Sequence, residues 1–98
     1  MSNVIVSNPF EVPAGQEDKA LELWDKFAGY FRAQPGYISS KLHRAVSPDA
    51  RFHLITLSEW ESAEHFQAAL TSDELKKLIE SSTDVPPSYP GVYEVIRT

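Results

Sequence analysis

The stretch from Leu54 to Leu70 changes its hydrophobic period in the middle, and this change limits the folds open to the chain. Apolar residues alternate up to Trp60, which predicts a strand, whereas Phe66 and Leu70 recur at helical spacing after Ser62. Ser62 suits an N-cap because its hydroxyl can accept a hydrogen bond from a free backbone N–H of the first helical turn. A strand that leads directly into a capped helix predicts a domain that mixes strands and helices, with the large Trp60 side chain at the junction.

The rest of the chain supplies the other elements of such a domain. Strands are expected over residues 3–12, 37–46, 51–60 and 91–98, and helices over residues 16–33, 62–70 and a short segment that opens at Thr71. Thr71 and Glu74 have the spacing of a capping box, which predicts Thr71 as the N-cap of the short helix. A four-residue turn at residues 47–50 predicts a hairpin that places His43 opposite Leu54. This order of elements predicts the ferredoxin-like α+β fold, in which a four-stranded antiparallel sheet carries its helices on one face.

The second strand of the expected hairpin has apolar residues on both faces. Leu54 and Trp60 lie on one face, and Ile55 and Leu57 lie on the other. The helices can cover only one face of the sheet, so the second apolar face is left for another protein surface. We therefore expect a homodimer in which two sheets pack face to face.

Composition excludes several classes of protein. The 98 residues are expected to form a single domain over residues 1–98, and a formal net charge of −5 argues against a nucleic-acid partner. No apolar run approaches the roughly 18–20 residues that a membrane span needs. The chain has no cysteine, which excludes disulfides and thiol chemistry, and its start lacks the pattern of a signal peptide. A cytoplasmic protein is therefore expected.

Asn8 is a polar residue on an otherwise apolar strand face, between Val6 and Phe10. Its amide must find hydrogen-bond partners or face a cavity. Pro9 cannot donate to a β-ladder, so strand pairing is expected to be interrupted beside Asn8. Asn8 is thus either a pocket residue or a structural amide, and Trp60 is either a pocket wall or a core residue whose indole N–H bonds to the backbone.

Aromatic residues in the first helix share one apolar face. Trp24, Phe27 and Phe31 have the spacing of core residues, whereas Tyr30 is able to point its hydroxyl into a pocket. The three histidines, His43, His53 and His65, lack the spacing of a metal motif, so no metal site is expected.

Three segments of the chain resemble the antibiotic biosynthesis monooxygenase family of dimeric α+β barrels. They are Asn8-Pro9-Phe10-Glu11-Val12-Pro13-Ala14-Gly15, then Gln34-Pro35-Gly36-Tyr37, then Glu59-Trp60-Glu61-Ser62 followed by Phe66 and Leu70. The resemblance implies a small oxygenase that acts on quinols or polycyclic anthrones without a cofactor. It also implies a relationship to haem-degrading monooxygenases.

The resemblance to the haem-degrading members is incomplete. Asn8 resembles the first-strand asparagine that lines the pocket in those members. Their pocket tryptophan corresponds to Ala69, and their haem-ligating histidine falls near Leu78 or Ile79, where this chain has no imidazole. These departures weaken the haem interpretation.

The anthrone-oxidising members resemble this chain at the strand-to-helix junction. Trp60 and Phe66 correspond to their tryptophan and a nearby tyrosine, and Thr56 stands where an amide is expected. Cofactor-free oxygenation needs a reduced substrate, an apolar pocket and groups that hold the substrate oxygens or take a proton. The catalytic candidates are Asn8, Trp60 and His53; the substrate-binding candidates are Tyr30, Phe27, Thr56, Phe66 and Ala69.

The expected function is therefore oxidation of an aromatic quinol-type or anthrone-type substrate with dioxygen, by a homodimer without a bound cofactor. Two alternatives are a haem-binding or haem-degrading protein with unusual ligation, and a dimeric ligand-binding protein without catalytic activity.

Overall fold

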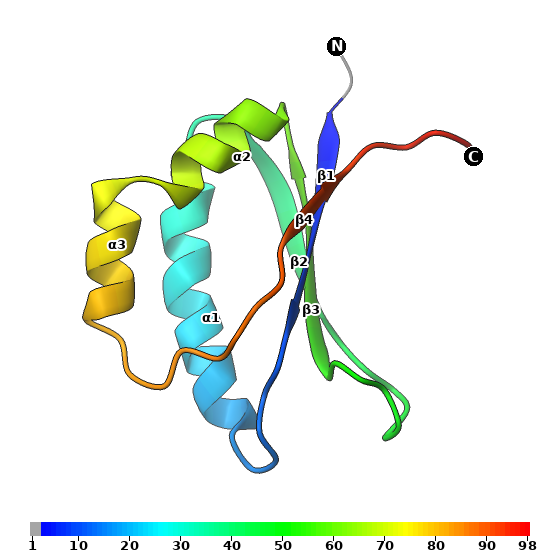
Figure 1. Ribbon diagram of the computed structural model, residues 1–98, viewed down its shortest axis with the longest axis vertical. Helices are drawn as coiled ribbons and strands as arrows, with labels where there is room; N and C mark the ends of the chain where they lie inside the picture. The colour runs from blue at the N-terminus through cyan, green and yellow to red at the C-terminus, as the bar shows by residue number, and fades with distance from the viewer. Residues whose placement is uncertain (1–2) are drawn as a thin grey trace.

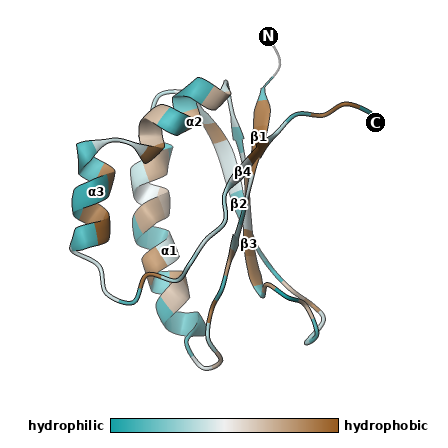
Figure 2. Cartoon of the chain, viewed as in Figure 1, coloured by the Kyte–Doolittle hydropathy of each residue, from teal (hydrophilic) through white to brown (hydrophobic). Residues whose placement is uncertain are grey.

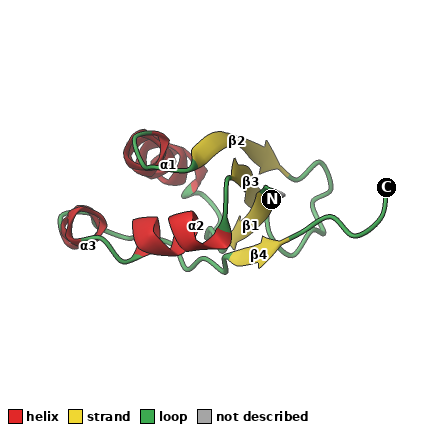
Figure 3. Ribbon diagram, turned by 90° about the horizontal axis from the view of Figure 1, so that it is seen from above, coloured by secondary structure: helices red, strands yellow, loops and turns green. Residues whose placement is uncertain are grey.

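One antiparallel sheet with strand order β2-β3-β1-β4 carries three helices on one face, as seen from above in Figure 3. The computed structural model describes residues 3–98. The elements are β1 (Val4–Phe10), α1 (Glu17–Arg32), β2 (Tyr37–Arg44), β3 (Leu54–Trp60), α2 (Ala63–Leu70), α3 (Asp73–Glu80) and β4 (Gly91–Tyr93) (Figure 1). This arrangement confirms the predicted ferredoxin-like α+β fold.

Pro9 does not interrupt the pairing of β1 with β3, contrary to the prediction. The register is continuous through Asn8 opposite Thr56 and Pro9 opposite Ile55. The Pro9 carbonyl instead accepts a hydrogen bond from the Tyr89 N–H, on the other side of β1. Since the N–H and C=O of a strand residue point the same way, the missing N–H of Pro9 also faces that side. The ladder between β1 and β3 therefore loses no donor.

The hairpin between β2 and β3 is one residue out of the predicted register. His43 lies opposite Ile55, and Arg44 lies opposite Leu54. The strands end before the expected turn, and Ala45 N–H donates to the His53 carbonyl at 2.8 Å beyond the last paired residues. The loop is therefore longer than a four-residue turn, which shifts the pairs from Ser39 to Arg44 by one residue. An irregularity between Tyr37 and Ser39 then places Tyr37 opposite Trp60, as in the predicted register.

The N-cap of α2 is confirmed, whereas the predicted N-cap of α3 is wrong. The Ser62 hydroxyl accepts a hydrogen bond from His65 N–H, as expected for a cap. Ser72, not Thr71, caps α3, and its hydroxyl accepts from Leu75 N–H. Thr71 instead ends α2, where its hydroxyl donates to a carbonyl of the last turn. The capping-box spacing identified the correct turn but missed the cap by one residue.

Replacing Ser72 by alanine is expected to lower the unfolding free energy by about 1 kcal/mol, because the cap of α3 is lost. The same change at Thr71 is expected to cost much less, since Thr71 caps no N-terminus. Urea unfolding followed by circular dichroism compares the two variants. An equal loss in both would contradict this cap assignment.

The last strand is much shorter than predicted. Residues 91–98 were expected to form a strand, but β4 ends at Tyr93, which lies opposite Ile5. Because β1 begins at Val4, only one of its residues remains for pairing beyond that point. The segment after β4 therefore leaves the sheet and extends away from the helices (Figure 1).

The face of the sheet opposite the helices is partly apolar. Leu57 and Tyr93 are 41% and 60% exposed, and Val95 and Ile96 follow in the exposed C-terminal segment. Figure 2 shows hydrophobic residues along β1, β3 and this segment. The structure thus leaves an apolar surface on the uncovered face, which is the surface assigned to a second copy in the sequence-based prediction.

Candidate active site

A cavity of about 200 Å³ lies between the inner face of the sheet and the helices. Its floor comes from β1 and β3, and its largest wall comes from α1, which contributes Leu23, Phe27 and Phe31. Phe66 of α2 and residues between 85 and 90 contribute further parts of the lining. Because most of the lining is aliphatic and aromatic, the cavity suits an apolar ligand.

Two polar side chains lie side by side on the cavity floor. Asn8 of β1 and Thr56 of β3 are directly opposed in the strand register, and both line the cavity. The side-chain oxygen of Asn8 is buried and has no hydrogen-bond partner among residues 3–98. A buried acceptor left unpaired costs roughly 1–3 kcal/mol, so it is retained at the expense of stability. This pair is a polar feature to which a ligand oxygen can bind, and Ser40, Ser58 and Ser88 also line the cavity.

Trp24 of α1 reaches across to this pair. Its indole N–H donates to the Thr56 hydroxyl oxygen at 2.8 Å. The sequence placed Trp24 in the core by helical spacing alone, and nothing in the sequence connects it with Thr56. Only the packing of α1 on the sheet brings the two together.

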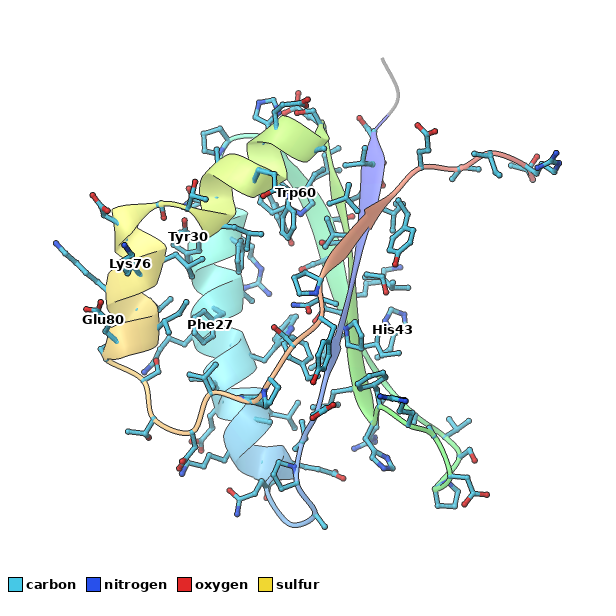
Figure 4. The ribbon with its side chains drawn as sticks, viewed as in Figure 1. Phe27, Tyr30, His43, Trp60, Lys76 and Glu80 are labelled. Atoms are coloured by element: carbon cyan, nitrogen blue, oxygen red, sulfur yellow. The ribbon has the colours of Figure 1, made fainter. Side chains whose placement is uncertain are left out.

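Trp60 serves both of the roles that the sequence left open. It is 1% exposed, and its ring makes edge contacts with Phe31, Tyr37 and Phe66. It also lines the cavity, and Figure 4 shows it between the sheet and the helices. Its indole N–H was expected to bond to backbone, but it donates to the Ser58 hydroxyl at 3.1 Å. Ser58 lies two residues before Trp60 on the same strand face, which brings its hydroxyl within reach of the indole.

The eight predicted site residues separate into two groups. Those that line the cavity together are Asn8, Phe27, Thr56, Trp60 and Phe66. Those outside its lining are His53, Tyr30 and Ala69. The Tyr30 hydroxyl donates to the Ala69 carbonyl at 2.6 Å and contacts the Ser72 hydroxyl, so it joins α1 to the helices α2 and α3 (Figure 4). His53 lies just before β3, and its carbonyl accepts from Ala45 N–H.

The segment from residue 83 to residue 90 contributes to the cavity lining and is held by two side-chain contacts, in addition to backbone hydrogen bonds that join Pro87 to Glu11 and Tyr89 to Pro9. Lys19 of α1 forms an ion pair with Asp84, and this hydrogen-bonded lysine lowers the pKa of the Asp84 carboxyl. The Tyr89 hydroxyl donates to Glu11 at 2.8 Å, and this bond raises the pKa of the Tyr89 hydroxyl. Both contacts are exposed, so they position the segment without adding much stability.

The residues present do not provide a histidine ligand for haem. None of His43, His53 and His65 lines the cavity, and the ring of His43 lies on the uncovered side of the sheet (Figure 4). Of Leu78 and Ile79, the two residues near the position that resembles the ligand of haem-degrading proteins, Ile79 lines the cavity. Within residues 3–98, no group of three or more histidine and acidic side chains is placed to hold a metal ion.

None of the described helices is long and apolar enough to cross a membrane.

The fold is that of a small α+β domain with a mostly apolar cavity between its sheet and its helices. The chain matches the family model described as antibiotic biosynthesis monooxygenase over residues 3–81, and it belongs to that family. No curated protein gives a significant match to the chain.

Solved structures agree with this assignment. A candidate monooxygenase from Shewanella loihica is 31% identical, with a TM-score of 0.84 and coverage of 99% of this chain and 97% of that one. SnoaB, a cofactor-independent oxygenase from Streptomyces nogalater, is 20% identical, with a TM-score of 0.81 and coverage of 100% and 97%. The haem degrader MhuD from Mycobacterium tuberculosis is 24% identical, with a TM-score of 0.76 and coverage of 97% of both chains. The last two show likeness of fold, and the family as a whole supports a monooxygenase-type function.

Proposed function

We propose that the protein oxidises an aromatic substrate of the quinol or anthrone type with dioxygen, inside the cavity and without a bound cofactor. The observation that carries this proposal is the Asn8–Thr56 pair, placed on the floor of a mostly apolar cavity. An apolar cavity binds the aromatic rings, and the polar pair holds a substrate oxygen at one fixed position. The likeness of fold to a cofactor-independent oxygenase supports the same reading.

The reaction balances without an outside reductant. The substrate loses two hydrogens and gains one oxygen atom from dioxygen, and the second oxygen atom leaves with those two hydrogens as water. All the electrons therefore come from the substrate, which must be reduced enough to pass an electron to dioxygen after it loses a proton. The protein contributes by excluding water and by hydrogen bonding to the substrate oxygen as negative charge develops on it.

The roles of the cavity residues follow from their contacts. Asn8 and Thr56 are proposed to bind the substrate oxygen, while Phe27, Trp60 and Phe66 are proposed to pack against its rings. Three of the predicted site residues lie outside the cavity lining and are therefore not proposed to contact the substrate; they are His53, Tyr30 and Ala69.

Oxygen uptake tests the proposed activity. The protein is mixed with a panel of hydroquinones, naphthohydroquinones and anthrones, and the rate of autoxidation without protein is subtracted. Uptake above that rate is expected, with one labelled oxygen atom in the product when isotopic dioxygen is supplied. Measurable binding of these compounds without turnover of any of them would overturn the oxygenase and leave a ligand-binding protein.

We also propose that the protein is a homodimer formed through the uncovered face of the sheet. A second copy would bury the exposed side chains of Leu57 and Tyr93 and the apolar C-terminal segment. Since the chain has a mass of 11.0 kDa, sedimentation is expected to give twice that value, about 22 kDa.

Replacing Leu57 by glutamate is expected to produce the monomer, because a charge would be buried at the interface. An 11.0 kDa species at micromolar concentration for the unaltered chain would contradict the dimer. The cytoplasmic location stays a prediction from the sequence.

A further inference from the structure

The hydrogen bond between Trp24 and Thr56 has only one possible direction. An indole N–H is a donor and never an acceptor, so the Thr56 hydroxyl oxygen must accept at the 2.8 Å distance. The hydroxyl hydrogen of Thr56 is then left to donate elsewhere, and no protein acceptor for it is found among residues 3–98. Because Thr56 lines the cavity, that hydrogen is available to a ligand.

The indole also makes the hydroxyl a better donor. A hydroxyl that accepts a hydrogen bond becomes more polarised, and hydrogen bonds in such a chain strengthen each other. Trp24 lies on α1 and Thr56 lies on β3, so this bond ties the cavity wall to the cavity floor. The indole N–H occupies one of the three staggered directions around the hydroxyl oxygen, so the hydroxyl hydrogen is restricted to the other two.

The amide beside it is held differently. The side-chain oxygen of Asn8 has no partner in the described part of the chain. A half-turn of an amide exchanges its oxygen and its nitrogen with almost no change of shape, so either atom can face the cavity. Thr56 therefore offers a donor whose direction is restricted by the protein, and Asn8 offers a group whose direction is set by the ligand.

We propose that Trp24 is a positioning residue, which sets the Thr56 hydroxyl to donate to an oxygen of the aromatic ligand while Asn8 adapts to that oxygen. The inference rests on the proposed function, and it names what the site selects. The ligand must present an accepting oxygen at its edge, as a quinol, its anion and a quinone all do. The Asn8 amide can accept from a hydroxyl before oxidation and donate to a carbonyl after it, so one site holds both substrate and product.

Binding tests this inference independently of turnover. The probes are 1,4-naphthoquinone, which carries accepting oxygens, and naphthalene, which carries none; the quinone has no thiol to react with in a chain without cysteine. Equilibrium dialysis is expected to show about 3–10-fold tighter binding of the quinone, the value of one hydrogen bond. Thr56→Val is expected to remove this preference and Thr56→Ser to keep it.

Trp24→Phe keeps an aromatic ring and removes the indole N–H. It is expected to reduce the quinone preference about 2–5-fold, and the double variant Trp24→Phe/Thr56→Val is expected to equal Thr56→Val alone. Phe31→Leu is the matched control, since Phe31 also lines the cavity from α1. It is expected to weaken both probes equally, so the ratio between them stays unchanged.

The inference is overturned if Trp24→Phe leaves the quinone preference unchanged, or if the two changes are additive in the double variant. Absence of binding of both probes to the unaltered protein also overturns it. Should Trp24→Phe fail to fold, equal preferences in Thr56→Val and Thr56→Ser would overturn it. If Trp24→Phe reduces the quinone preference and the unaltered protein shows no oxygen uptake, this inference stands and the proposed oxygenase activity is wrong. If Trp24→Phe leaves the quinone preference unchanged and the unaltered protein takes up oxygen, the oxygenase activity stands and this inference is wrong.

Discussion

Replacing Asn8 by leucine is expected to lower kcat/KM for the quinol substrate about 100-fold while leaving the unfolding free energy unchanged or about 1 kcal/mol higher. Activity falls because the amide is proposed to hold the oxygen on which charge develops, and removal of one such group costs about 10²–10³-fold in other enzymes. Stability does not fall because the Asn8 oxygen is buried without a partner, and leucine of similar volume removes that cost.

The opposite signs of the two effects make this test informative. A structural amide would show the reverse pattern, with a loss of about 1 kcal/mol or more in stability and little change in turnover. Asn3→Leu is the matched control, because Asn3 precedes the same strand but is exposed and bonds to Glu59. It is expected to leave kcat/KM unchanged. Oxygen uptake and urea unfolding measure the two quantities on the same preparations.

Replacing Trp60 by alanine is expected to lower the unfolding free energy by about 3–5 kcal/mol. Trp60 is 1% exposed and is packed edge-on by three aromatic rings, so its removal leaves a large void in a small core. Domains of this size have total stabilities of only about 5–15 kcal/mol, so the variant is expected to be partly unfolded near 37 °C. Thermal unfolding followed by far-ultraviolet circular dichroism gives the measurement.

Trp60→Phe separates the packing of the ring from its hydrogen bond. This variant keeps most of the apolar contacts and loses the N–H that donates to Ser58. It is expected to lose much less stability than the alanine variant, about 1–2 kcal/mol. If Trp60→Ala lost less than about 1 kcal/mol, Trp60 would have to be a wall of the cavity and not the centre of the core.

The parts of the fold that the sequence predicted well are those with a strong local period. The change from alternation to helical spacing correctly located β3, α2 and the Ser62 cap, because each depends on residues within a few positions of one another. The same alternation correctly placed Asn8 on the inner face between Val6 and Phe10, and all three line the cavity.

The details that failed depend on partners distant in the chain. Thr71 and Ser72 are both acceptable caps by sequence, and only the path of the chain between α2 and α3 selects Ser72. The strand expected over residues 91–98 has suitable residues throughout, but a strand also needs a neighbouring strand. Tyr93 lies opposite Ile5, and β1 begins only one residue before Ile5, so the residues after Tyr93 have almost no strand to pair with. Local pattern carries no information about where the partner strand stops.

For the candidate site, the sequence by itself determined the class of fold, the inner face that carries Asn8 and Thr56, and the aromatic residue at the strand-to-helix junction. Only the tertiary structure decided which side chains meet there. It brought Trp24 to Thr56 across 32 positions of sequence, and it turned Tyr30 to the carbonyl of Ala69. The physical reason is that periodicity reports the face on which a residue lies, whereas a hydrogen bond requires two atoms within about 3 Å, which only the packing of one element on another can set.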